Sequence, residues 1–107
     1  MKAVMIIFNQ SISDEVYDIL DNLQIRGFTR WLDVHGRGTE KGEPHYGTHI
    51  WPSENGVLLT VVQDDKVEPI LEDVKKINAQ AEEEGIRAFV WTIERAIYKR
   101  LNRNNFF

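Results

Sequence analysis

The chain contains no cysteine and no long apolar run among its 107 residues. The absence of thiols excludes a disulfide scaffold, a thiolate metal site and a thiol nucleophile. No apolar stretch approaches the roughly 18 residues of a membrane-spanning helix, and the apolar N-terminal stretch is too short for a secretion signal. We therefore expect a soluble, cytoplasmic protein.

Basic residues are fewer than acidic ones: the chain has 13 Lys and Arg and 17 Asp and Glu, which gives a net charge of -4. This balance disfavours a nucleic-acid partner. No serine or threonine lies in a recognisable nucleophile motif, and no carboxylate pair is placed on facing elements. We therefore expect no catalytic residues and no enzyme. The length and the 42% of hydrophobic residues predict one domain with a single modest core.

Two kinds of hydrophobic periodicity alternate along the chain. The four strand-like runs are 3–8, 28–35, 56–63 and 86–93. Helical spacing over 12–23 and 67–81 indicates two helices, and we expect Ser11 to cap the first helix and Gly27 to end it. The order predicts an α+β fold, a ferredoxin-like βαββαβ sandwich. Its four-stranded antiparallel sheet would carry two helices on one face and a long loop between strands 2 and 3.

The second face of this sheet is expected to need a partner, because two helices can cover only one face. In the second strand we expect simple alternation, which places Trp31 and Asp33 on one face. Trp31 would share the uncovered face with residues of the last strand, which are either Phe89 and Trp91 or their neighbours. An exposed apolar face of this kind favours an oligomer packed through its sheets.

The segment 36–55 is too rich in glycine for regular structure and unusually long for a loop in so small a domain. Its opening matches Gly-x-Gly-x-x-Lys-Gly at Gly36, Gly38, Lys41 and Gly42. That motif opens the T-loop of the PII signal-transduction family. The run Glu94-Arg95-Ala96-Ile97-Tyr98-Lys99-Arg100 is similar to that family's closing Glu-Asp-Ala-Ile-Arg-Ile-Arg. In motifs and element order, the chain resembles this family as far as residue 100.

The resemblance implies a PII-like domain over 1–97, with a flexible T-loop-like segment at 36–55 and a C-terminal tail at 98–107. It implies a homotrimer that senses a small ligand in the clefts between subunits and controls a partner protein, which could be a membrane transporter. Tyr46 and Trp51 would bind that partner. The residues expected at the ligand are Gly36, Arg37, Gly38, Lys41, Gly42 and Arg100.

Two departures from the family pattern argue against nucleotide binding in the family's manner and leave the cofactor unknown. The family's glycine-rich B-loop, which supplies backbone N–H groups to phosphates, corresponds here to the short acidic segment 82–87. One of the two tail arginines that contact phosphate is replaced by Tyr98.

Two alternative functions stay open. A metal-binding or metal-tolerance trimer would hold a divalent ion through His35, His45 and His49, because imidazole and carboxylate ligands suit zinc, nickel and copper. A catalytic ferredoxin-like domain would instead enclose a substrate-sized cavity within one subunit.

Overall fold

The computed structural model describes residues 1–36, 54–80 and 85–99 of the chain. The four strands are β1 (Lys2–Asn9), β2 (Thr29–Val34), β3 (Asn55–Val62) and β4 (Ile86–Thr92). The helices are α1 (Ser13–Asn22) and α2 (Val67–Gln80), preceded by the 3-10 turns η1 (Gln10–Ile12) and η2 (Asp64–Lys66). The strands form one sheet in the order β2-β3-β1-β4, and every neighbouring pair is antiparallel.

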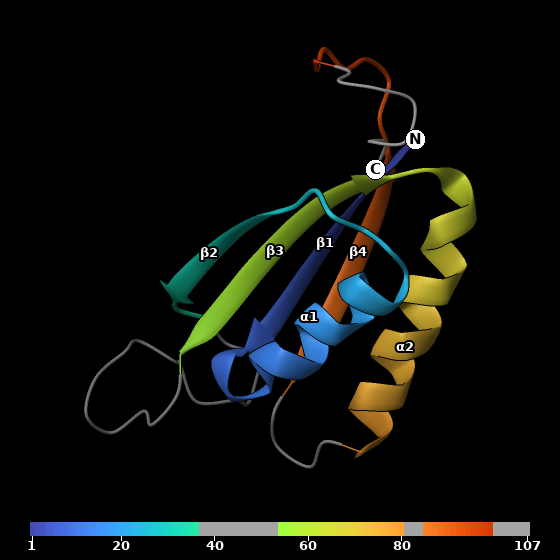
Figure 1. Ribbon diagram of the computed structural model, residues 1–107. Coiled ribbons are helices and arrows are strands. Elements are labelled where there is room, and N and C mark those ends of the chain that lie inside the picture. The colour runs from blue at the N-terminus through green and yellow to red at the C-terminus, as the bar shows by residue number, and fades with distance from the viewer. Residues whose placement is uncertain (37–53, 81–84, 100–107) are drawn as a thin grey trace.

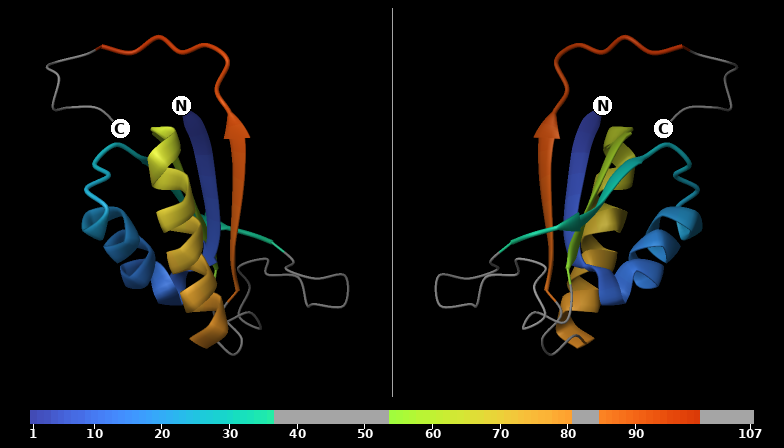
Figure 2. Two further views of the ribbon diagram at one scale, coloured as in Figure 1. Left: turned by 90° about the vertical axis from the view of Figure 1, so that its right-hand side faces the viewer. Right: turned by 90° about the vertical axis from the view of Figure 1, so that its left-hand side faces the viewer.

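Both helices lie on the same face of the sheet, which gives two layers (Figures 1 and 2). The predicted α+β ferredoxin-like fold with two helices on one face is confirmed. The core fills the space between the layers, because alternate residues of β1 and β3 point toward the helices. On the strands these buried residues are Val4, Ile6, Phe8, Leu58, Val62 and Ile86. From the helices the core includes Val16, Ile19, Leu20, Ile70 and Val74, and Ile25 joins it after α1.

The opposite face of the sheet carries large exposed aromatic side chains, and the structure places Phe89 and Trp91, rather than their neighbours in β4, on this face with Trp31. Trp31, Phe89 and Trp91 are each nearly half exposed. The strand register places them on one face, since Trp31 pairs with Val57 and Phe89 pairs with Met5 in neighbouring strands. Within the described residues of the chain, no helix covers this face.

The ends of α1 differ from the prediction, because tertiary context decides both. Asn9 caps the turn that leads into the helix by accepting a hydrogen bond from the Ser11 backbone, so the prediction that Ser11 is the cap is wrong. The helix ends at Asn22, before Gly27. Gln24 has a φ of 60° and takes the left-handed position that glycine usually fills after a helix.

A β-bulge in β2 breaks the simple alternation that the sequence predicts. The register shifts between Trp31 and Val34, and Asp33 has a φ of 59°. An extra residue in one strand redirects the side chains that follow it. Trp31 therefore lies on the sheet face that was predicted for it. After Trp31, simple alternation no longer predicts which residues of β3 pair with β2.

Candidate ligand cavity

A cavity of about 440 Å³ lies where the start of β2, the middle of β3 and the chain after β4 come together. Its walls are formed by the segments 27–29, 59–61 and 96–98, together with Met1. The chain that leaves β4 crosses over the N-terminal end of β1, which brings the third of these segments to the site (Figure 2). Three segments that are far apart in the sequence thus line the same cavity.

Hydrogen bonds fix the wall at 27–29 to its neighbours. The hydroxyl of the buried Thr60 donates to the backbone carbonyl of Gly27 at 2.6 Å. This bond satisfies the one polar side chain among the buried residues described, because a buried hydroxyl without a partner would be costly. Next along the chain, Thr29 pairs with Leu59 in the sheet. Lys66 also donates to the backbone carbonyl of Leu23, which holds the end of α1 close to η2.

An aromatic stack supports one wall of the cavity. The rings of Phe28 and Tyr17 have centroids 6.1 Å apart and planes 22° apart. The guanidinium of Arg30 lies 5.4 Å from the Tyr17 ring centroid and donates to the Tyr17 hydroxyl at 2.6 Å. Phe28 remains 43% exposed and lines the cavity. The stack therefore presents an aromatic surface to a ligand.

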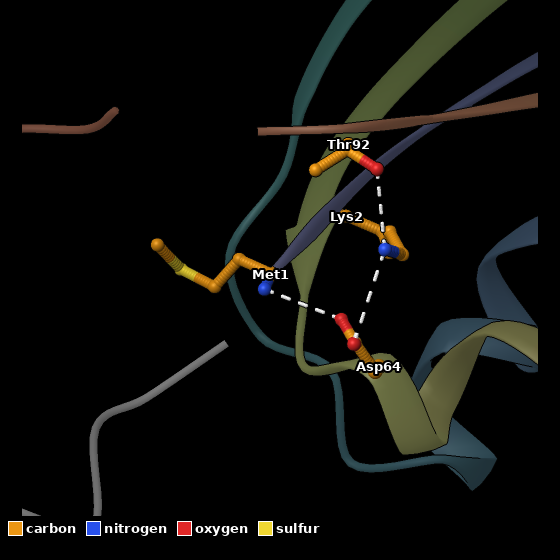
Figure 3. Close-up of polar contacts among 4 residues, drawn as sticks. All are labelled: Met1, Lys2, Asp64 and Thr92. Atoms are coloured by element: carbon orange, nitrogen blue, oxygen red, sulfur yellow. Dashed lines mark hydrogen bonds and ion pairs between the residues drawn. The ribbon is translucent and has the colours of Figure 1, made fainter. Parts of the chain in front are cut away.

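A small polar network lies beside the cavity and joins three elements (Figure 3). The N-terminal amine of Met1 lies 3.2 Å from one carboxylate oxygen of Asp64, and Lys2 lies 3.9 Å from the other. Lys2 also donates to the Thr92 hydroxyl at 3.2 Å. Because Asp64 is exposed, these ion pairs contribute little to stability. Their effect is to connect η2 and β4 to the start of β1.

Chemically, the cavity suits a planar, largely apolar group with a polar edge. Leu59, Val61 and Phe28 contribute apolar side chains to the lining, which also includes Thr29 and Tyr98, two residues whose side chains carry a hydroxyl. The volume falls within the range of about 300–1,000 Å³ that small-molecule sites occupy.

Comparison with known proteins gives the family. The sequence model of the nitrogen regulatory protein P-II matches residues 1–103. The chain belongs to the P-II family. No curated protein sequence matches this P-II chain.

Solved structures of similar fold include CPII, a PII-like protein from Thiomonas intermedia K12, bound to ADP and bicarbonate. It is 18% identical with a TM-score of 0.67, and the match covers 88% of each chain. The same protein bound to ADP, AMP and acetate is 17% identical over 88% of each chain, with a TM-score of 0.64. A putative PII-like signaling protein from Thermus thermophilus is 19% identical with a TM-score of 0.60, covering 84% of this chain and 83% of that one.

At these identities the likeness concerns the fold. The ADP and AMP bound by CPII nevertheless give no support to the expectation that the acidic segment 82–87 argues against nucleotide binding.

Two of the predicted site residues fall within the described chain. Gly36 follows the end of β2, and its packing is close, because a Cβ there would lie 2.8 Å from the Asn55 side-chain nitrogen. His35 precedes it and is exposed. The cavity adjoins Thr29 at the opposite end of β2, so the cavity and Gly36 lie apart within the chain. The other predicted residues lie outside the described chain, namely Arg37, Gly38, Lys41, Gly42, His45, Tyr46, His49, Trp51 and Arg100.

The metal alternative therefore stays a prediction. Within residues 1–36, 54–80 and 85–99, no three His, Asp or Glu side chains are grouped so that they could hold an ion. Two of its three histidines, His45 and His49, fall outside these ranges. None of the helices described here is long and apolar enough to span a membrane.

Sequence reasoning missed the cavity walls at 27–29 and 59–61. The sequence marks Gly27 only as the end of a helix, and Phe28 and Thr29 only as the start of a strand. No local pattern marks a ligand wall in 59–61, which reads as an ordinary buried strand. The one available signal was an aromatic residue directly after a glycine at a strand start, and that signal has no specificity.

Proposed function

We propose that this P-II chain is a regulatory protein, and not an enzyme, that binds an adenine nucleotide through the cavity beside Phe28. The observation that carries the proposal is the aromatic wall of that cavity, held in place from outside by Tyr17. A purine base is planar and apolar on its faces and polar along its edge. Stacking on an aromatic side chain is a common way to bind such a base. The ADP bound by the similar CPII structures supports this choice of ligand.

A homotrimer would complete the site. The uncovered sheet face with Trp31, Phe89 and Trp91 supplies an apolar surface for assembly. In such an assembly the cavity of one subunit would face the end of β2 of its neighbour, so that base and phosphates are bound by different chains. The phosphate-binding residues would be the predicted set at Gly36, Arg37, Gly38, Lys41, Gly42 and Arg100.

Regulation would act through the segment 36–55, in a protein located in the cytoplasm. Tyr46 and Trp51 would contact the regulated partner protein, which could be a membrane transporter. Ligand binding would change the order of this segment, a common mechanism of switching. The domain would span 1–97, with the tail 98–107 contributing Tyr98 and Arg100 to the ligand.

The experiment is to measure ADP binding by calorimetry for the wild type and for Phe28→Ala. Loss of a base–aromatic stack costs about 1–3 kcal/mol, which corresponds to an increase in Kd of about 5- to 150-fold. Leu32→Ala is the matched control, because Leu32 is also 43% exposed but does not line the cavity. Equal ADP affinity of Phe28→Ala and the wild type would overturn the assignment of the cavity to the base.

A further inference from the structure

Gln10 uses all of its polar groups to join three parts of the chain. Its backbone N–H donates to the Glu54 carbonyl at 2.9 Å, and its backbone carbonyl accepts from the Ser13 hydroxyl at 2.8 Å. Its side-chain amide makes two bonds with Asp33. The nitrogen donates to the Asp33 carboxylate at 3.1 Å, and the oxygen accepts from the Asp33 backbone N–H at 3.0 Å.

The partner residue, Asp33, has an unusual backbone. Its φ of 59° lies in the left-handed region, which residues with a Cβ rarely adopt. It forms the bulge of β2, where the register shifts between Trp31 and Val34. Strained residues of this kind persist when their surroundings fix them, and they concentrate near functional sites. The two side-chain bonds from Gln10 are the surroundings that fix Asp33.

The bulge changes how the end of β2 pairs with β3. After the register shift, Val34 pairs with Asn55, and Gly36 packs against the Asn55 side chain. Glu54, bonded to the Gln10 backbone, immediately precedes Asn55. One residue on η1 therefore holds the chain both at the start and at the end of the segment 36–55. The adjacent Asn9 backbone N–H donates to Gly85 at 3.2 Å, so the chain entering β4 is fixed at the same point.

We propose that Gln10 is a positioning residue for Gly36. It does not line the cavity, but it keeps the Asp33 backbone in the left-handed conformation and so sets the direction in which the chain leaves β2 beside Asn55. The importance of this position for ligand binding rests on the proposed function, in which Gly36 begins the phosphate-binding residues. Gln10 would then control affinity for the phosphate end of ADP from outside the ligand site.

The test is a cycle of four full-length proteins: wild type, Gln10→Ala, Asp33→Gly and the double variant. Glycine adopts a φ near 60° without a steric penalty, so at position 33 it has less need of Gln10. Amide hydrogen exchange of Val34, Gly36 and Asn55 is measured without ligand. We expect Gln10→Ala to speed exchange about tenfold, as the loss of two side-chain hydrogen bonds predicts, and to have a clearly smaller effect when residue 33 is glycine.

Gln63→Ala is the matched control, because Gln63 is an exposed glutamine whose side chain makes no capping bond to η2. Unchanged exchange in Gln10→Ala would overturn the proposal. So would an equal effect of Gln10→Ala in both backgrounds, because Gln10 would then act without Asp33.

Calorimetry with ADP on the same four proteins tests the link to ligand. We expect Gln10→Ala to weaken binding several-fold and Asp33→Gly to restore part of the loss. Unchanged affinity, despite faster exchange, would contradict the link while leaving the positioning of Gly36 established. If the wild type does not bind ADP, the proposed function fails, and the exchange cycle still decides the role of Gln10.

Discussion

Phe28 stacks on Tyr17, and Tyr17 in turn lies beneath the guanidinium of Arg30. The stack connects a wall of the cavity to α1, which is packed on the core through Val16 and Leu20. The wall is therefore fixed from behind by a residue that does not line the cavity. This arrangement makes the orientation of Phe28 testable without changing any group that would contact the ligand.

Truncating Tyr17 is expected to weaken ADP binding. Aromatic pairs contribute about 0.5–1.5 kcal/mol beyond their buried area, so Tyr17→Ala should raise Kd by about 2- to 10-fold. Tyr17→Phe keeps the ring and loses only the bond from Arg30, so its Kd should stay closer to that of the wild type. Calorimetry gives Kd, and near-ultraviolet circular dichroism reports the packing of the rings. An affinity as low in Tyr17→Phe as in Tyr17→Ala would show that stacking is not the cause.

Gly56 is expected to tolerate no side chain. A Cβ at this position would lie 2.8 Å from the ring of Phe8, which is itself buried in the core. Gly56→Ala should therefore lower the free energy of unfolding by about 1–3 kcal/mol, the usual cost of overpacking. Urea denaturation measures the change.

A control variant and a second-site background show whether the clash with Phe8 is the cause of the lost stability. Gly85→Ala should be near neutral, since nothing lies within 4 Å of a Cβ there. In a Phe8→Leu background, Gly56→Ala should cost less, because the two sites are in contact. Additive effects of the two substitutions would be inconsistent with the clash.

Replacing Gln24 by glycine is expected to stabilise the protein. Gln24 occupies the left-handed position after α1, where its backbone N–H bonds to Asp21 and that of Ile25 bonds to Leu20. Glycine removes the steric penalty, and the gain should be up to about 1 kcal/mol. Gln63→Gly is the control and should destabilise, because Gln63 has a φ of -67°. Thermal denaturation of both variants checks this, and a lower melting temperature for Gln24→Gly would refute it.

Gln10→Glu is expected to make stability depend on pH. The new carboxylate would lie at the position of the Gln10 nitrogen, 3.1 Å from the Asp33 carboxylate. Like charges at that distance raise the pKa of the pair in the folded state above the unfolded value of about 4. Because the folded state then binds protons more readily, the variant should be least stable relative to wild type near pH 7. The difference should shrink as the pH falls through the raised pKa.

The measurement for this variant is urea unfolding of both proteins at neutral and mildly acidic pH. Added salt should also reduce the difference, since both residues lie near the surface. Gln10→Ala serves as the comparison that lacks the charge. A stability difference between Gln10→Glu and wild type that does not vary with pH would exclude the repulsion.

The order of strands and helices was predictable because hydrophobic periodicity carries it. Apolar runs predicted β1 and β3, alternation predicted β2 and β4, and the apolar stripe that contains Ile70 and Val74 predicted α2. The number of helices predicted an uncovered sheet face that carries Trp31, but it left open whether Trp91 or its neighbours lie there. These features depend on the burial of whole faces, which a single sequence records.

The details that shape the site depend on pairs distant in sequence. Asp33 adopts its left-handed conformation with the help of Gln10, which lies 23 residues earlier. Phe28 is positioned by Tyr17, and no local pattern links them. The early end of α1 at Asn22 follows from the fit of Ile25 into the core rather than from a glycine. Periodicity does not record such contacts, which is why the cavity and the bulge escaped prediction.

Binding of an adenine nucleotide by a trimer of this P-II chain is tested most directly by calorimetric titration of ADP into wild-type protein whose mass in solution is measured at the same time. We expect a mass three times that of the 12.5 kDa chain and saturable binding of one ADP per subunit. A monomeric protein, or an assembled protein that takes up no ADP at millimolar concentration, would contradict it.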